Sequence, residues 1–254
     1  MSHTYDYPEY YEIAFSFRDI PAEVNLFEQC FERFARIPVK SVLELACGNC
    51  PHLEELARRG YAFTGLDTNR AMLDYSRAKA ARLTTPVNLI CGDMNDFDLD
   101  LPVDFAYIMV GSLIVRDTAE LHAHFDAVAR ALKPGGLYLL DWCIQYELEL
   151  ESEGSRWTLE ADGIEVKTTV TWKSVNQVEQ TFEETVLLEV NDHGKKLTVG
   201  EPYLRRAIYP QEFLCLIERL ERFEFVGWWN LWDLQQPLAE ADNISRPIAL
   251  VRRV

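Results

Sequence analysis

The chain has 254 residues, and 25 lysines and arginines against 41 aspartates and glutamates give it a formal net charge of −16. Hydrophobic residues make up 48% of it and aromatic residues 12%. A soluble chain of this length buries roughly 70% of the surface that its unfolded form exposes, so overall disorder is excluded. The longest apolar stretch, residues 105–115, is about half of the ~20 residues that a membrane-spanning helix needs, and no membrane span is expected.

The N-terminus and the charge balance bear on location and partners. Met1 to Tyr7 contain neither the basic region nor the apolar stretch of a secretion signal, which predicts a cytoplasmic protein whose six cysteines stay reduced. Affinity for DNA or RNA comes mostly from lysine and arginine, so the acidic surplus disfavours nucleic acid as a partner. The basic pairs at 58–59, 195–196 and 205–206 are interpreted as solvated surface.

Residues 38 to 143 alternate between strand-like and helix-like patterns. Short apolar runs typical of strands occur at 42–46, 61–67, 86–91, 104–110 and 137–140. Between them, helical spacing or good helix formers predict helices over 53–59, 69–83 and 118–132, the last starting at an Asp117 or Thr118 cap and stopped by Pro134-Gly135-Gly136. Such alternation builds a parallel sheet with helices on both faces.

The pattern changes after Cys143. From about residue 157 to residue 208 the apolar residues recur with a period of two, as in Val166, Val170 and Trp172, which predicts an antiparallel β insert. A helix over 210–223 and strands over 225–229 and 247–251 then resume the first pattern. An apolar sheet face needs a cover, and the large aromatic side chains nearby, Trp157 and Trp228-Trp229 among them, are expected to contribute to it.

The candidate site lies at the carboxyl ends of the predicted strands, where open parallel sheets bind their ligands. The first strand runs through Glu44 into a tight turn of small residues around Gly48. The second ends in Asp67, placed to accept hydrogen bonds from the two hydroxyls of a ribose. The third ends in Asp93, followed by Met94, a pair suited to the amine and the ring of an adenine. Three acidic groups on successive strand ends suit a nucleoside that carries a positive charge and do not suit a pyrophosphate.

With these segments the sequence resembles the class I S-adenosylmethionine-dependent methyltransferases. The matching segments are 42–48, 65–67, 91–94, 105–113 and 132–136, in order and at the usual spacing. The resemblance implies a doubly wound, Rossmann-like seven-stranded α/β sheet whose last strand is antiparallel, with the β insert after the fifth strand. The Tyr10-Tyr11 and Arg18-Asp19 segment and the insert look like the small-molecule members that include amino-sugar N-methyltransferases.

The resemblance also implies a domain layout and a set of residues around the cofactor. Residues 1–37 would be an N-terminal helical lid, 38–149 with 209–254 the cofactor-binding domain, and 150–208 the insert. The cofactor would be S-adenosyl-L-methionine, with S-adenosyl-L-homocysteine as its product. The implied cofactor-binding residues are Tyr11, Arg18, Glu44, Ala46, Cys47, Gly48, Asp67, Thr68, Met72, Asp93, Met94, Val110 and Gly111. Ala46 and Cys50 stand where the family usually has the first and third glycines of its loop.

Three other interpretations of the chemistry carry less weight. Cys47 and Cys50 at a helix start have the spacing of a thioredoxin-like redox pair, but that much shorter fold would leave Asp67 and Asp93 unexplained. No metal is expected, because no second Cys or His pair at ligand spacing accompanies the first. His52, His122 and His124 are interpreted as helix-surface residues.

The implied reaction is methyl transfer to a nitrogen or oxygen of a small molecule. The leaving group is already activated by its positive charge, so the protein must mainly align the acceptor and exclude water. Residues on the acceptor side are Tyr11, Ser112, Arg116 and Trp142, none of which is singled out as a base. The insert either roofs the acceptor pocket or pairs two subunits as a homodimer. The alternative function is that of a noncatalytic subunit that binds the same cofactor.

Overall fold

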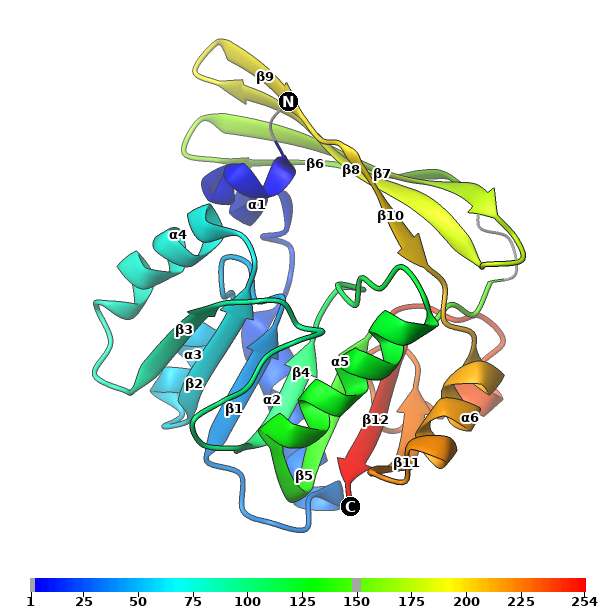
Figure 1. Cartoon of the computed structure of the whole chain (residues 1–254). Coiled ribbons are helices and arrows are strands. Elements are labelled where there is room, and N and C mark those ends of the chain that lie inside the picture. The colour runs from blue at the N-terminus through cyan, green and yellow to red at the C-terminus, as the bar shows by residue number, and fades with distance from the viewer. Residues whose placement is uncertain (1–2, 148–151) are drawn as a thin grey trace.

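The structure, a computed structural model, describes residues 3–147 and 152–254. It consists of a seven-stranded sheet flanked by helices and a smaller antiparallel sheet that lies above one end of it (Figure 1). Within the described residues, no helix is both long and apolar enough to cross a membrane.

The main sheet has the order β11-β12-β5-β4-β1-β2-β3. Its strands are β1 (Ser41–Leu45), β2 (Ala62–Asp67), β3 (Val87–Cys91), β4 (Val103–Ile108), β5 (Leu132–Asp141), β11 (Phe223–Trp229) and β12 (Ile248–Arg253). The pairs among β1 to β5 are parallel, whereas β12 is antiparallel to both β5 and β11. The predicted seven-stranded α/β sheet with an antiparallel last strand is therefore confirmed.

The helices follow the predicted order. They are α1 (Pro8–Ala14), α2 (Ile20–Phe34), α3 (Leu53–Arg58), α4 (Arg70–Ala80), α5 (Thr118–Ala131) and α6 (Pro210–Leu220), with short 3-10 turns η1 (Thr4–Asp6) and η2 (Leu238–Glu240). Asp117 caps α5 as expected, because its Oδ1 accepts a hydrogen bond from the Glu120 amide at 2.9 Å. Asn69 caps α4 in the same way, through the Met72 amide at 3.0 Å.

Two apolar clusters hold the helices on the main sheet. On one face, α5 and α6 pack through residues such as Phe125 and Phe213. On the other, α2 and α3 pack through residues such as Phe27 and Leu56 against Phe105 of β4. Helices cover both faces of the sheet (Figure 1). Its strands are therefore nearly continuous apolar runs in the sequence.

The insert forms the second sheet. Its strands are β6 (Ser152–Ala161), β7 (Ile164–Asn176), β8 (Thr181–Asp192), β9 (Lys195–Val199) and β10 (Pro202–Arg206), all paired antiparallel. The predicted alternation is confirmed in β7, where Val166 is buried and Glu165 and Lys167 are exposed. The predicted boundary at residues 149 and 150 lies outside the described residues.

The N-terminal helix covers part of the insert. Ala14 of α1 packs in a third apolar cluster with Val186 and Leu188 of β8, and the Ala14 carbonyl accepts a hydrogen bond from Trp157 Nε1 at 2.6 Å. In Figure 1, α1 lies between α4 and the insert. The expectation that Trp228-Trp229 would cover the insert is wrong, because both side chains pack against the apolar clusters of the main sheet.

The start of β5 also differs from the expectation. Pro134-Gly135-Gly136 was expected to stop the helix and precede the strand, but α5 ends at Ala131 and these residues lie within β5. The register between β4 and β5 shifts here, with Val103 opposite Leu132 and Phe105 opposite Leu137. The two glycines make this register shift possible. Gly135 has a φ of +86°, and a Cβ on Gly136 would lie 2.5 Å from the Asp104 carbonyl oxygen.

Candidate functional site

The loop after β1 turns sharply at alternate residues. Ala46, Gly48 and Cys50 have φ angles of +49°, +51° and +48°. This left-handed conformation costs a residue with a Cβ about 1–2 kcal/mol, which explains the preference for glycine in such a loop. Ala46 and Cys50 adopt this left-handed conformation although each has a Cβ. Gly48 leaves open space, since a Cβ there would meet only Met72 Sδ, at 4.0 Å.

Asp67 joins this loop to the end of β2. Its Oδ2 accepts a hydrogen bond from the Gly48 amide at 2.7 Å and its Oδ1 one from the Asn69 amide at 2.7 Å. Burial raises the pKa of the Asp67 carboxyl, against these backbone hydrogen bonds, which lower it. The side chain is partly exposed, and each carboxylate oxygen can accept a further hydrogen bond.

The remaining predicted residues on the β2 and β3 side line the same edge of the sheet. Thr68 and Asp93 are exposed, and Asp93 Oδ1 accepts a hydrogen bond from the Asn95 amide at 2.9 Å. Met72 is buried beside Gly48, and Met94 is partly buried against the cluster under α5. The structure thus brings these four side chains to the edge where Asp67 lies, and their contacts with a cofactor remain predictions.

Glu44 lies beneath this edge in a buried hydrogen-bond network. Its Oε1 lies 3.2 Å from His52 Nδ1, and its Oε2 accepts a hydrogen bond from the Tyr107 hydroxyl at 3.1 Å. The other ring nitrogen of His52 lies 2.8 Å from Glu23 Oε2. Burial lowers the pKa of His52, but the attraction of Glu44 and the hydrogen bonds to Glu23 and Glu44 outweigh it, so the pKa is raised.

The interpretation of the histidines was wrong for two of the three. His52 is fully buried in the network around Glu44, and His124 is fully buried, with its Nε2 2.8 Å from the Tyr138 hydroxyl. His122 is partly buried on α5. The burial of His52 could not be predicted from the sequence, because its partners lie on α2 and β1 and meet only in the folded chain.

Two arginines complete the network around Glu23. Arg18 donates to both Glu23 oxygens, at 3.1 and 2.6 Å, and Arg246 donates to Oε1 at 2.6 Å. Burial would raise the pKa of Glu23, but the hydrogen bonds from His52 and Arg18 lower it well below its usual range. Arg246 also lies 3.6 Å from Asp141 at the end of β5, which accepts a hydrogen bond from the Val110 amide at 2.9 Å. Glu23, Asp141 and Arg246 were missed at the sequence level.

A cavity of about 420 Å³ lies between this edge, the N-terminal segment and the insert. Of the predicted acceptor-side residues, Tyr11, Ser112 and Trp142 line it, as do Val110 and Gly111 from the predicted cofactor set. Arg116 does not line it: this side chain is exposed and its Nε donates to Glu120 at 2.7 Å at the start of α5. The structure therefore does not bring Arg116 together with the other three residues.

The roof of this cavity carries a cluster of polar side chains, centred on Glu184, that the sequence did not indicate. Glu184 of β8 accepts hydrogen bonds from Trp172 Nε1 at 2.8 Å, from Arg205 at 2.7 Å and from the Tyr203 hydroxyl. Arg205 also donates to the Gly111 carbonyl at 2.6 Å and so joins the insert to the loop after β4. The interpretation of Arg205 as solvated surface is wrong, because it is 9% exposed.

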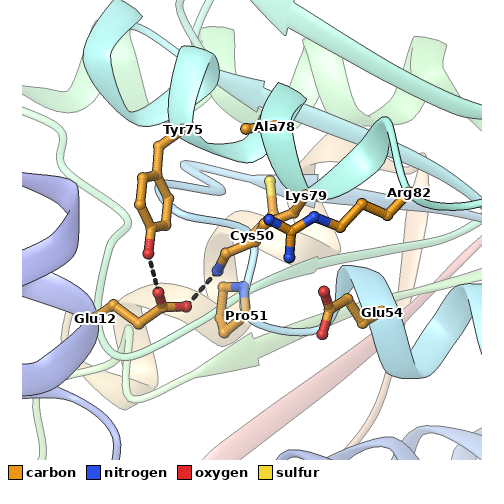
Figure 2. Close-up of a pocket in the computed structure, with 8 residues that line it drawn as sticks. All are labelled: Glu12, Cys50, Pro51, Glu54, Tyr75, Ala78, Lys79 and Arg82. Carbon is orange, nitrogen blue, oxygen red and sulfur yellow. Dashed lines mark hydrogen bonds and ion pairs between the residues drawn. The ribbon is translucent and has the colours of Figure 1, made fainter. Parts of the chain in front are cut away.

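A second cavity, of about 360 Å³, lies behind the loop after β1 (Figure 2). Glu12 of α1 accepts hydrogen bonds there from the Tyr75 hydroxyl and from Lys79, both on α4. Lys79 also donates to the Asn49 carbonyl at 3.0 Å. Glu12 thus fastens α1 to α4 beside the loop after β1.

The two loop cysteines are buried free thiols. The hydrogen bond with Cys50 and burial raise the pKa of Cys47 well above its usual value. A redox-active cysteine needs a lowered pKa, so this environment is that of an inert thiol. Within residues 3–147 and 152–254, no three His, Cys, Asp or Glu side chains are grouped as metal ligands would be.

Comparisons with known proteins agree with this architecture. Residues 42–136 match the family model described as a methyltransferase domain. The chain is 31% identical over 126 residues to a dTDP-4-amino-2,3,4,6-tetradeoxy-D-glucose N,N-dimethyltransferase of Saccharopolyspora spinosa, a match that covers 49% of this chain and 48% of that protein. The chain spans about half the length of the curated relatives it matches.

Solved structures resemble nearly the whole chain. One is an S-adenosylmethionine-dependent methyltransferase from Clostridium acetobutylicum, with a TM-score of 0.76, 17% identity and 96% of each chain covered. Another is an amino pentose methyltransferase from Micromonospora echinaspora, solved with S-adenosylmethionine bound, with a TM-score of 0.71, 20% identity and 96% of each chain covered. Residues 42–136 therefore match the model of a methyltransferase domain, and the chain as a whole shares the Rossmann-like fold of these solved structures.

Proposed function

We propose that this protein transfers the methyl group of S-adenosylmethionine to the nitrogen of a small-molecule amine. The observation that carries the proposal is the position of the larger cavity, whose lining includes Val110 and Gly111 at the edge where Asp67 ends β2 and Asp93 follows β3. A cofactor held along that edge would meet an acceptor inside the cavity. The likeness to relatives named as sugar N,N-dimethyltransferases supports the same chemistry.

The residues at the edge fit this cofactor. Asp67 and Asp93 give it two acidic groups, which suit a positively charged nucleoside, above the buried Glu44 that binds His52 and Tyr107. Gly48 leaves room for close approach of a ligand to the backbone. Asp67 would accept hydrogen bonds from the ribose, and Asp93 with Met94 would hold the adenine. Bound there, S-adenosylmethionine supplies an electrophilic methyl group on a sulfonium.

The cavity residues favour nitrogen over oxygen as the attacking atom. A hydroxyl acceptor needs a base to take its proton, whereas an amine only has to be neutral. Glu184 is held by three donors, none of the described cavity residues is a histidine, and the remaining carboxylate, Glu147, is exposed to solvent. The chain would then act by orienting the acceptor and excluding water, with the N-terminal segment as a lid and the insert as a roof.

The proposal is tested by measuring catalytic turnover. The purified chain is incubated with S-adenosylmethionine and a panel of amine and hydroxyl metabolites, and formation of S-adenosylhomocysteine is measured. Calorimetry with both forms of the cofactor measures binding separately. The proposal expects binding and amine-dependent turnover. Binding without any turnover would favour a noncatalytic cofactor-binding subunit, and no heat with either form of the cofactor would refute both functions.

A further inference from the structure

The walls of the larger cavity are mostly aromatic. Trp157, Trp172 and Phe182 face it from the insert, and Tyr11 and Phe15 from the N-terminal segment. Phe15 and Trp157 pack edge to face with ring centroids 5.7 Å apart. Such surfaces bind apolar groups, and their ring faces also attract cations.

Among the described residues that line the cavity, none offers a ligand an unpaired positive charge. Arg205 is the one basic side chain in this lining. Its terminal nitrogens donate to Glu184 at 2.7 Å and to the Gly111 carbonyl at 2.6 Å, and its Nε is buried without a hydrogen-bond partner. The charge of Arg205 is therefore neutralised by Glu184 inside the protein.

The other charged side chains among the described residues that line the cavity are acidic, namely Glu147 and Glu184. Glu147 is exposed, whereas the Glu184 carboxylate is paired with Arg205. Binding of phosphate groups relies on arginine and lysine. A diphosphate would therefore enter a site with no free cation to meet it, on a chain whose net charge is −16.

From this arrangement we infer that the acceptor is an apolar amine without a phosphate group, in contrast to the dTDP-linked sugars named for the curated relatives. The inference rests on the proposed methyl transfer and specifies its substrate class. The aromatic walls hold the apolar body, Glu147 attracts the amine as its cation, and the Glu184–Arg205 pair keeps the roof from attracting phosphate. The cation releases its proton to water as it enters, so that the neutral nitrogen attacks the methyl group.

The first experiment uses the unmodified chain saturated with S-adenosylhomocysteine. 2-Phenylethylamine and thymidine diphosphate are titrated in turn, with calorimetry and quenching of tryptophan fluorescence as readouts, since Trp157 and Trp172 line the cavity. We expect saturable binding of the amine and at least roughly tenfold weaker binding of the nucleotide, the effect of one unfavourable close charge.

The second experiment changes the charge of the roof. Glu184→Gln leaves Arg205 without its counter-ion, so amine affinity should fall and thymidine diphosphate affinity should rise, each by roughly tenfold. Glu183→Gln is the matched control, because Glu183 is the preceding residue on β8 and does not line the cavity. Circular dichroism establishes that the variants fold, and the experiment on the unmodified chain stands even where they do not.

The outcomes separate the two levels of the proposal. Tighter binding of thymidine diphosphate than of the amine by the unmodified chain would overturn the inference about the acceptor, and so would a failure of the amine to bind while S-adenosylhomocysteine binds. Both results leave the proposed methyl transfer intact. Failure of S-adenosylhomocysteine to bind at all would remove the proposed function, and the inference with it.

Discussion

At the scale of single residues, Asp67 has two tasks. Its carboxylate fastens the turn after β1 through the Gly48 amide, and we propose that it also accepts hydrogen bonds from the ribose of the cofactor. Asp67→Ala should therefore lower the affinity for S-adenosylmethionine at least roughly tenfold, since a hydrogen bond to a charged acceptor contributes about 1.5–3 kcal/mol.

The comparison for this prediction is Asp74→Ala. Asp74 is an exposed residue of α4 that pairs only with Arg77 on the same helix. By calorimetry, Asp74→Ala should bind S-adenosylmethionine with the affinity of the unmodified chain, and Asp67→Ala at least roughly tenfold more weakly. Equal affinities would place the ribose contact on another residue.

His52 makes the stability of the protein depend on pH. Its folded-state pKa is raised above the usual value of about 6.5. Its contribution to the free energy of unfolding is therefore fully present below about pH 6.5 and is lost as pH rises through the raised pKa. Glu23, whose pKa is lowered, contributes above its usual value of about 4.5 and loses that contribution at lower pH.

The measurement is urea unfolding between pH 5 and pH 9 for the unmodified chain and for His52→Gln. The stability difference between the two should be largest at the acidic end and should shrink as pH rises. His193→Gln, at an exposed position in the β8–β9 turn, serves as control. A difference that stays constant over this range would show that His52 does not carry the charge.

At the scale of elements, the attachment of α1 depends on Glu12. This residue accepts hydrogen bonds from Tyr75 and Lys79 of α4, beside the loop after β1 (Figure 2). Glu12→Ala should raise the rate of amide hydrogen exchange in α1 and speed cofactor dissociation several-fold, at a cost in global stability of about 1 kcal/mol or less, because the contacts are partly exposed.

Glu9→Ala is the matched variant, since Glu9 is an exposed glutamate one turn earlier on the same helix. It should leave both rates unchanged. Equal exchange rates in the Glu12 and Glu9 variants would mean that the apolar contacts of α1 with the insert hold the helix on their own.

The elements that the sequence could predict are those with a strong local signal. Period-two alternation located β7 and β8, and apolar runs separated by helical patterns located β1 to β4. The largely buried network of Glu23, His52, Asp141 and Arg246 could not be predicted, because it joins α2, the residue before α3, β5 and the loop before β12. Arg205 was misplaced for the same reason: the carbonyl of Gly111, its partner, is 94 residues away in the chain.

At the scale of the whole molecule, the insert serves two neighbours at once. It roofs the larger cavity and it packs against α1 through the apolar cluster around Ala14. Replacing residues 155–207 by a Gly-Ser linker should therefore remove methyl transfer and weaken cofactor binding through loss of the α1 contacts, while the main sheet stays folded.

Sedimentation of the same variant measures whether the insert also pairs subunits. A change from dimer to monomer would support a homodimer contact, and an unchanged state would limit the insert to the roof. A folded variant that still methylates the native acceptor would show that the insert is only a cover.

The contacts between the N-terminal segment and the insert also constrain the order of folding during synthesis. Thr4 donates to the Val186 carbonyl and Tyr10 to Asp192, and each of these hydrogen bonds spans 182 residues. At ~5–20 residues per second, a ribosome needs roughly 10–40 s to make that length of chain. Thr4 and Tyr10 therefore emerge long before these partners, and the larger cavity closes only after β1 to β5 have been made.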